Sequence, residues 1–267
     1  MIIAITAEKG GVGKTTSTIN IGSYFALKGY KTLLIDFDQQ ANATRGVFRK
    51  GVSHTIYDAL ASKVKFSEII QKQGDVNNLY VAPGSAALAE LEVPLVSNLI
   101  TGPYRLRRLI EDAQIRQDYD FIIIDSSPSM GIFTMNVMTC SDFLLIPMEG
   151  GDLFSFDGVD KVLKSYRAII EERTNPTLKI LGGFFNKMDT RLSIVQVLEE
   201  ETRKKFEQNN IHLFKQVVHS NVRIKEAHWS GKPIYIHDPG STGAQDFAAL
   251  SEEILQRVTE MVAPARG

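Results

Sequence analysis

The 267-residue sequence contains one cysteine, carries almost no net charge and has no long hydrophobic run. A single cysteine, Cys140, excludes an internal disulfide and is consistent with a reducing compartment. Cys140 lies in an apolar helical pattern, so we interpret it as a buried structural thiol. The formal net charge of −1 provides no overall field that would attract a polyanion. Any binding of nucleic acid must therefore use a local basic patch.

Membrane and export signals are also lacking. No apolar run is long enough to span a bilayer. The first residues, MIIAITAEKG, have no basic region before the apolar run, so they predict a first strand and not a signal peptide. We therefore expect a soluble, cytoplasmic protein.

Short apolar runs alternate with helical patterns along the chain. The expected strands are Ile2–Thr6, Lys31–Asp36, Leu79–Ala82, Phe121–Asp125, Phe143–Pro147, Lys179–Phe185 and His212–His219. The expected helices are Thr15–Leu27, Tyr104–Ile115, Ile132–Thr139, Asp157–Glu171, Ser193–Gln208 and Gly243–Met261. This alternation predicts an α/β fold whose twisted, mostly parallel sheet is covered by helices on both faces. We expect a single domain over residues 1–262, a short tail at 263–267, and ligands beyond the carboxyl ends of the strands.

The stretch EKGGVGKTT lies between the first expected strand and the first expected helix. It approaches the phosphate-binding pattern G-x-x-x-x-G-K-[ST], although Glu8 replaces the first glycine. Lys14 is expected to reach the β- and γ-phosphates, Thr15 to ligate Mg²⁺ and Thr16 to support the α-phosphate. The loop backbone is expected to bind phosphate through Gly10, Gly11, Val12 and Gly13.

A second lysine in this stretch needs its own explanation. Lys9 could face the triphosphate of a neighbouring subunit, as an arginine finger supplied in trans does. It could equally be a solvated lysine. The loop by itself does not separate these two interpretations.

Three acidic residues end apolar strands. Asp36 and Asp38 follow KTLLI, and Asp125 follows FIII. In a parallel sheet they share the edge that carries the glycine loop, where Asp36 and Asp125 could hold Mg²⁺ or its water shell. Asp38 is the candidate for positioning an attacking water. The alternative is that some of these acids cap helices or are solvated.

Three segments resemble the deviant Walker ATPases, and within them the ParA/Soj class of partition ATPases. They are KGGVGKTT at 9–16, DFDQQANAT at 36–44 and FIIIDSSPS at 121–129. The C-terminal segments at 221–227, 231–234 and 238–244 are also similar to that class. The resemblance extends nearly from end to end, and the combination is far more specific than any single motif.

The resemblance implies a P-loop fold that binds ATP and Mg²⁺ and forms an ATP-dependent homodimer as a nucleotide sandwich. In such dimers the lysine at Lys9 reaches the partner's phosphates, and the acid at Asp38 orients the hydrolytic water. The class binds DNA without sequence preference on the nucleoid. A ParB-like centromere-binding protein stimulates its slow ATP hydrolysis, which drives plasmid or chromosome segregation.

The resemblance also suggests DNA-binding residues. Arg191 and Arg223 match the positions of two DNA-contacting arginines, and Lys225 could extend that patch. Phosphate contacts need cations on one face, which a protein of nearly zero net charge can supply. The alternative for each is an exposed, solubilising charge.

The end of the site that would hold the base is less readable. Asn186 follows an expected strand and could bind the base, and the loop beginning at Pro239 could line the pocket. The stretch NKMD at 186–189 is similar to the guanine motif of GTPases, although the ParA resemblance favours ATP. Gln39 and Ala41 stand where the class usually has proline and glycine, so the loop behind Asp38 could differ.

Competing functions remain within the same superfamily. A MinD-like membrane ATPase would end in a basic amphipathic helix, whereas the segment Leu250–Met261 is acidic. A ParA-like positioner of a protein cluster would share every motif with a DNA-partition ATPase. A non-hydrolysing nucleotide-binding scaffold is disfavoured because Asp38 and Asp125 are present.

Overall fold

A central sheet organises the chain in the computed structural model, which describes residues 1–151, 155–188 and 193–263. Within these residues the sheet has seven strands in the order β3-β4-β2-β5-β1-β6-β7. The strands are β1 Ile2–Ile5, β2 Thr32–Phe37, β3 Gln71–Lys72, β4 Leu79–Ala82, β5 Phe121–Ser126, β6 Phe143–Glu149 and β7 Lys179–Asn186. All neighbouring pairs are parallel except β3 and β4. The mostly parallel α/β fold predicted from the sequence is confirmed.

The strand register brings the acidic residues to one edge of the sheet. Asp36 at the end of β2 lies opposite Asp125 of β5, and Ile5 at the end of β1 lies opposite Asp125 on its other side. The loop that follows β1 therefore begins beside both carboxylates. Parallel strands place all these carboxyl ends together, which is where ligands bind in sheets of this kind.

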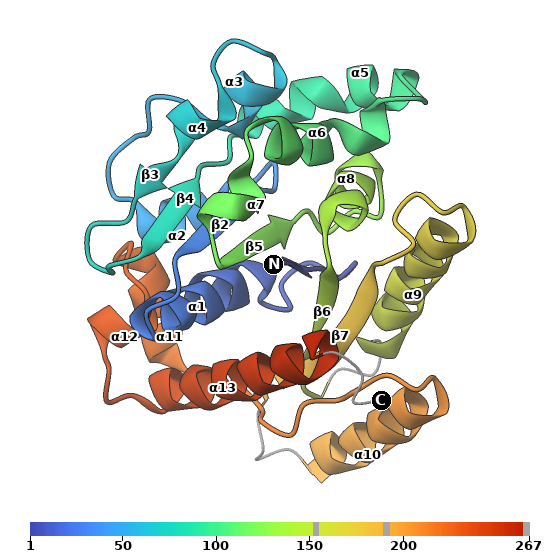
Figure 1. The fold of residues 1–267 in the computed structure, drawn as a ribbon. Helices are drawn as coiled ribbons and strands as arrows, with labels where there is room; N and C mark the ends of the chain where they lie inside the picture. Colours follow the sequence, from blue (N-terminus) through green and yellow to red (C-terminus); the bar gives the residue numbers. More distant parts are fainter. Residues whose placement is uncertain (152–154, 189–192, 264–267) are drawn as a thin grey trace.

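Helices cover both faces of the sheet (Figure 1). Alternate residues of β1 enter separate cores: Ile2 and Ala4 on one face, Ile3 and Ile5 on the other. Both sides of the strand are thus buried, which explains its continuous apolar sequence. One face is covered by α1 Lys14–Leu27 and α13 Thr242–Val262, and the other by α6 Arg105–Asp112, α8 Ile132–Cys140 and α9 Ser155–Glu171.

Shorter helices fill the connections, including most of the weakly patterned region 45–103. They are α2 Asn42–Val47, α3 Ile56–Leu60, α4 Phe66–Ile69, η1 Ala86–Leu91, α5 Glu92–Ser97, η2 Gly102–Tyr104 and α7 Ile115–Asp118. The C-terminal part adds α10 Ser193–Gln208, α11 Val222–Trp229 and α12 Ile234–His237. The helix expected over Tyr104–Ile115 is broken, because Gln114 adopts a left-handed conformation with φ of 53° between α6 and α7.

The strand expected over His212–His219 is wrong. Among the described residues, the segment runs beside β7 but joins it only through isolated bridges, at Leu213 and at His219. The backbone amides of Lys215 and Gln216 donate to the Glu253 carboxylate of α13, at 2.9 and 3.0 Å, and not to a neighbouring strand. A continuous ladder cannot form where a side chain takes the backbone donors.

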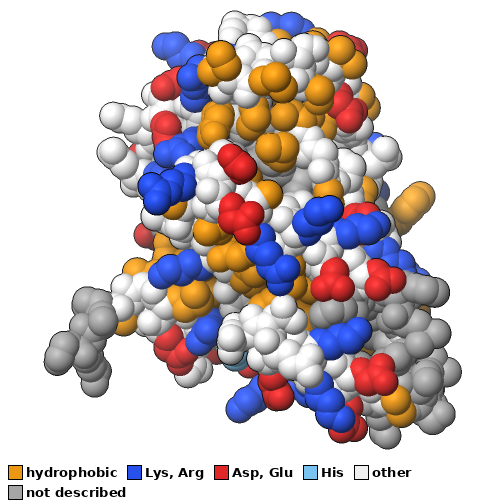
Figure 2. All heavy atoms as spheres, turned by 90° about the vertical axis from the view of Figure 1, so that its right-hand side faces the viewer, with side chains coloured by type: hydrophobic (Ala, Val, Ile, Leu, Met, Phe, Trp, Pro, Cys, Tyr) orange, Lys and Arg blue, Asp and Glu red, His pale blue; other side chains and the backbone are white. Residues whose placement is uncertain are grey.

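One face of the molecule carries a cluster of exposed hydrophobic side chains. Figure 2 shows hydrophobic side chains gathered toward the top of the face that lies to the right in Figure 1. Aliphatic residues with more than half of their surface exposed cluster in and after α5: Val93, Val96, Leu99 and Ile100. Within the described residues, no helix is long and apolar enough to cross a bilayer.

Candidate functional site

The loop between β1 and α1 forms the floor of the site. Gly11 and Gly13 have φ values of 83° and 90°, a left-handed conformation that glycine adopts without steric cost. Gly13 is the N-cap of α1 and makes no side-chain cap. The first backbone N–H groups of a helix have no partner within it and carry its positive end. This loop is therefore built to bind an anion.

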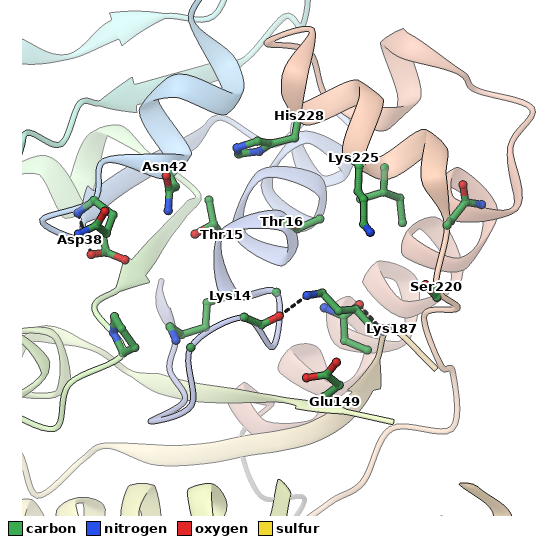
Figure 3. Close-up of a pocket in the computed structure, with 18 of the residues that line it drawn as sticks. Lys14, Thr15, Thr16, Asp38, Asn42, Glu149, Lys187, Ser220, Lys225 and His228 are labelled. Carbon is green, nitrogen blue, oxygen red and sulfur yellow. Dashed lines mark hydrogen bonds between the residues drawn. The ribbon is translucent and has the colours of Figure 1, made fainter. Parts of the chain in front are cut away.

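The end of β7 holds this loop in place. The Asn186 Nδ2 atom donates to the carbonyl oxygen of Val12 at 2.9 Å, and the backbone amide of Lys187 donates back to Asn186 Oδ1 at 2.9 Å. The Lys187 ammonium donates to the carbonyl oxygen of Gly11 (Figure 3). A Cβ atom at Gly13 would lie 2.1 Å from Asn186 Nδ2, so only glycine permits this close approach.

A cavity of about 720 Å³ opens above the loop. Figure 3 shows Lys14, Thr15 and Asp38 toward one end, and Lys187, Ser220 and Lys225 toward the other. The lining residues are Gly10, Gly11, Gly13, Lys14, Thr15, Thr16, Asp38, Gln40, Asn42, Pro128, Glu149, Asn186, Lys187, His219, Ser220, Asn221, Ile224, Lys225 and His228. The cavity thus gathers most of the predicted phosphate-binding residues, while Pro239 does not line it.

Lys14 supplies a buried positive charge at the loop. Its side chain is almost fully buried, and its ammonium donates to the carbonyl oxygen of Lys9 at 3.1 Å. Burial lowers the pKa of Lys14, and the nearby carboxylates of Asp125 and Asp38 partly oppose that shift. A bound polyphosphate would complete the compensation of this charge.

Asp125 has the chemistry expected of a cation partner. The carboxylate is fully buried, and within the described residues its Oδ2 atom has no hydrogen-bond partner. Burial and the neighbouring Asp36 carboxylate raise the pKa of Asp125 well above its usual value. A cation at this carboxylate would relieve both penalties. Because Mg²⁺ keeps several waters and uses substrate phosphates, one carboxylate and the Thr15 hydroxyl fit it without an all-protein cage.

Asp36 is fully buried and fastens α2 to the sheet. Its Oδ2 atom accepts hydrogen bonds from the Thr44 backbone amide at 2.7 Å and the Thr44 hydroxyl at 2.6 Å. The same hydroxyl accepts from the backbone amide of Gly84 at 2.8 Å. Burial raises the pKa of Asp36 to about 6, against the opposing hydrogen bonds from Thr44. The metal role expected for Asp36 stays a prediction.

Asp38 lies two residues further on, in the cavity wall. One carboxylate oxygen accepts from the backbone amide of Gln40 at 3.0 Å, which orients the group. The side chain is only 6% exposed. Asp38 is therefore a fixed carboxylate facing the place that phosphates would occupy.

Glu8 and Lys9 lie beside α9, at the outer edge of the glycine loop. Glu8 forms an ion pair with Lys161 of α9 at 2.5 Å. Lys9 is exposed, and its Cβ atom lies 3.9 Å from the position that a Cβ atom on Gly158 would take. The residue that replaces the motif's first glycine thus links the loop to α9.

The far wall of the cavity comes from α11 and the residues before it. His219, to which the sequence assigned no role in the site, lines the cavity and bonds Asp246 at 2.9 Å. His228 and Lys225 line it from α11. The sequence offered no signal for either histidine, because each contact depends on the packing of α11 and α13. Lys225 was expected to contact DNA, and here it faces the nucleotide cavity.

The other expected DNA contacts are only partly visible. Arg223, at the start of α11, is exposed and pairs with Glu226 at 2.8 Å and with Asp238 at 3.4 Å. Arg191 lies outside the described residues. The DNA-binding assignments stay predictions.

A P-loop nucleotide-binding protein with an additional lysine in its loop is the class that this fold and site define. A family model for the AAA domain matches residues 1–180. The chain is 38% identical to the sporulation initiation inhibitor protein Soj of Bacillus subtilis over 95% of this chain and 97% of Soj. It is 35% identical to the chromosome-partitioning ATPase Soj of Treponema pallidum over 94% of this chain and 95% of that protein.

The chain therefore belongs to the ParA/Soj family of AAA-domain proteins. The fold is also similar to that of cobyrinic acid a,c-diamide synthase from Mycobacterium smegmatis, solved with an ATP analogue and magnesium. That match has a TM-score of 0.81 and 22% identity, and it covers 97% of this chain and 96% of the other.

Proposed function

We propose that this protein is an Mg²⁺-dependent ATPase that dimerises on ATP, binds DNA without sequence preference and segregates plasmid or chromosome DNA. The observation that carries the proposal is the arrangement of Lys14, Asp38 and Asp125 around one glycine loop and one cavity. Membership of a family that includes a chromosome-partitioning ATPase supports the same activity. The protein would act in the cytoplasm, on the nucleoid.

Each group has a distinct role in this proposal. The amides of the loop and of the first turn of α1 bind the phosphates, and Lys14 neutralises charge that develops on them. Thr15 and Asp125 hold the magnesium ion, Asp125 through its buried carboxylate, and the ion neutralises the β- and γ-phosphates when bound. Asp38 orients a water for attack on the γ-phosphate.

Adenine would occupy the end of the cavity near β7 and α11. Asn186 and Lys187 are already bonded to the loop backbone, so their side chains set the shape of this end. Pro239 does not line the cavity, so its expected contact with the base would require the loop that begins at Pro239 to move toward the cavity. We therefore propose that the protein prefers ATP to GTP. A competition experiment, in which GTP is tested for its ability to displace bound ATP, measures this preference.

Dimerisation would place Lys9 of each subunit against the other subunit's phosphates. Lys9 is exposed beside α9, at the outer edge of the loop. The ion pair between Glu8 and Lys161 would fix the backbone that presents it. Because Lys9 of one subunit would pair with phosphates bound by the other, the dimer would form only when ATP is bound.

DNA binding would use Arg223 and Arg191, with Lys225 as a further contact if it turns away from the cavity. A ParB-like partner would stimulate hydrolysis and thereby release the dimer from DNA. The direct test is ATP turnover with and without nonspecific duplex DNA, together with DNA binding in ATP and in ADP. We expect slow turnover and DNA binding only with ATP. Equal DNA affinity in ATP and in ADP would contradict the proposal that ATP controls DNA binding. Absence of ATP turnover would contradict the proposal that the protein is an ATPase.

A further inference from the structure

An exposed tryptophan ends α11. Trp229 is the one tryptophan of the sequence, and 84% of its surface is accessible. Large aromatic side chains are usually mostly buried, and an exposed one is typical of a contact surface. Trp229 has no part in the nucleotide cavity, since it is absent from its lining.

Two exposed cations, Arg49 and Lys232, lie near the end of α11 that carries this tryptophan. The Arg49 Nε atom donates to the carbonyl oxygen of Ser230 at 2.7 Å, which places the end of α2 beside the end of α11. Lys232 follows on the same turn, where its backbone amide bonds Ala227 at 3.1 Å. Arg49, Trp229 and Lys232 are all exposed, and we name these three residues the Trp229 patch.

The acids near the Trp229 patch are already engaged. Glu226 of α11 pairs with Arg223 at 2.8 Å and lies 3.7 Å from His237. Asp238 lies 3.4 Å from Arg223. Within the described residues these carboxylates are engaged by Arg223 and His237, and no ion pair joins them to Arg49 or Lys232.

The helix that carries the patch also forms a wall of the nucleotide cavity. Ile224, Lys225 and His228 of α11 line that cavity. His228 packs against α2, where a Cβ atom on Gly46 would lie 2.6 Å from its ring. Through Thr44 of α2 this contact continues to Asp36 at the sheet edge. The patch is thus joined to the nucleotide site by two helices.

We propose that the Trp229 patch is a second contact surface for duplex DNA, an inference that rests on the proposed function. Arg49 and Lys232 neutralise backbone phosphates, while the Trp229 ring packs on the sugars between them. Arg223 and Trp229 are six residues apart, about 9 Å of helix rise. At 3.6 residues per turn the two side chains also lie about 120° apart around the helix axis, so the Trp229 patch is a surface distinct from that of Arg223.

The chemistry favours DNA over a protein partner. Protein interfaces are enriched in tryptophan and arginine but depleted in lysine. Surfaces that bind phosphate use both cations, and each contact releases a counterion, which makes binding depend on salt. An exposed tryptophan near both an arginine and a lysine therefore favours a polyanion over a protein partner.

Trp229 itself reports the contact, because no other tryptophan contributes to the emission. The full-length protein with Mg-ATP is titrated with an unlabelled duplex while tryptophan fluorescence is followed. Binding of a dye-labelled duplex is measured in parallel by anisotropy. We expect the emission to be quenched or shifted with the same affinity as the anisotropy change. Anisotropy that rises while the emission stays constant would overturn the patch and leave the proposed function intact. Absence of any anisotropy change would refute the proposed function itself.

Variants separate the aromatic contact from general charge. We expect Trp229→Ala and Lys232→Glu each to weaken duplex binding by about 5- to 50-fold, and Lys232→Glu to reduce the salt slope by about 1. Trp229→Phe should stay within about 3-fold of the wild type, because a smaller ring keeps the packing surface. Lys179→Glu is the charge-matched control, since this exposed lysine begins β7 at the opposite edge of the sheet. Equal losses in Lys179→Glu, or binding that prefers single strands over duplex, would overturn the patch.

Discussion

Asn186, the last residue of β7, holds the phosphate loop through a hydrogen bond of 2.9 Å from its Nδ2 atom to the carbonyl oxygen of Val12. The side chain is buried against Gly13, where no residue larger than glycine fits. A strand far from the loop in sequence thereby sets the shape of the nucleotide site. This contact gives Asn186 a structural role, and the role in binding the base that the sequence suggested stays a prediction.

Removal of this contact should weaken nucleotide binding. Asn186→Ala leaves the Val12 carbonyl without its partner, and we expect a loss of about 1–3 kcal/mol, roughly 5- to 150-fold in ATP affinity. Asn175→Ala is the matched control, because this buried asparagine donates to the carbonyls of Met138 and Ser141, away from the cavity. The control should lower the melting temperature without changing ATP affinity. Equal ATP affinity in both variants would contradict the role assigned to Asn186.

Lys14 should be essential for turnover. Lys14→Ala removes the cation that we propose neutralises the developing charge, and we expect at least about a 100-fold loss in turnover, measured by phosphate release. Lys164→Ala, an exposed lysine of α9, serves as the control and should keep wild-type turnover. Normal turnover in Lys14→Ala would show that the cavity is not the catalytic site.

Thr44 should contribute to stability through Asp36. Thr44→Val keeps the shape but removes a hydroxyl that donates to Asp36 and accepts from Gly84. We expect the free energy of unfolding to fall by about 1–3 kcal/mol, because two buried polar groups lose a partner. Thr259→Val on the exposed side of α13 should change it by less than about 0.5 kcal/mol. Chemical denaturation compares the two, and similar values would exclude the proposed anchor.

His228 should make the packing of α2 against α11 sensitive to acid. Burial, and then the charge of Arg45, lower the pKa of His228 below its ordinary value of 6.5. The unfolded chain therefore binds a proton more readily, so stability present above about pH 6.5 is lost as the pH falls toward the folded-state pKa. His228→Gln should flatten this decline in thermal melts across that range. The control His54→Gln changes a histidine in an exposed loop and should leave the acid-induced decline in stability unchanged. An unaltered decline in His228→Gln would refute the role of His228 in this pH dependence.

Arg223 should bind DNA without taking part in nucleotide binding. Reversal of this exposed charge in Arg223→Glu should weaken duplex binding at least about 10-fold and reduce its salt dependence. ATP-dependent dimerisation should persist, which light scattering measures. Arg191→Glu is expected to behave in the same way. Unchanged, salt-sensitive DNA binding in both variants would refute the expected arginine contacts.

The sequence predicted the fold well because its strands are buried on both faces. A run such as FIIID predicts a buried strand in any parallel sheet. The glycine loop can be recognised from the strand before it and the helix after it. His212–His219 has similar apolar content, but the amides of Lys215 and Gln216 in its middle donate to Glu253, which belongs to a helix and lies 38 positions from Lys215. No local sequence pattern predicts a contact between segments this far apart in the chain.

Contacts within the site were harder to predict for the same reason. The bond between Asn186 and Val12 joins residues 174 positions apart, and the ion pair between Glu8 and Lys161 joins residues 153 apart. The sequence identified which residue types gather at the sheet edge, because parallel strands bring their ends together. It did not reveal that Lys225 faces the cavity, since that depends on how α11 rotates against α2.

The central claim is that one bound ATP is sensed by two subunits. The most direct measurement is the molecular mass of Asp38→Ala by size exclusion with light scattering, in Mg-ATP and in Mg-ADP. Because the proposal assigns to Asp38 the orientation of the attacking water, we expect this variant to form a stable dimer in ATP and to be a monomer in ADP. Adding Lys9→Ala to this variant should abolish the dimer while ATP still binds. A monomer in ATP for Asp38→Ala, or an unchanged dimer after loss of Lys9, would contradict the account.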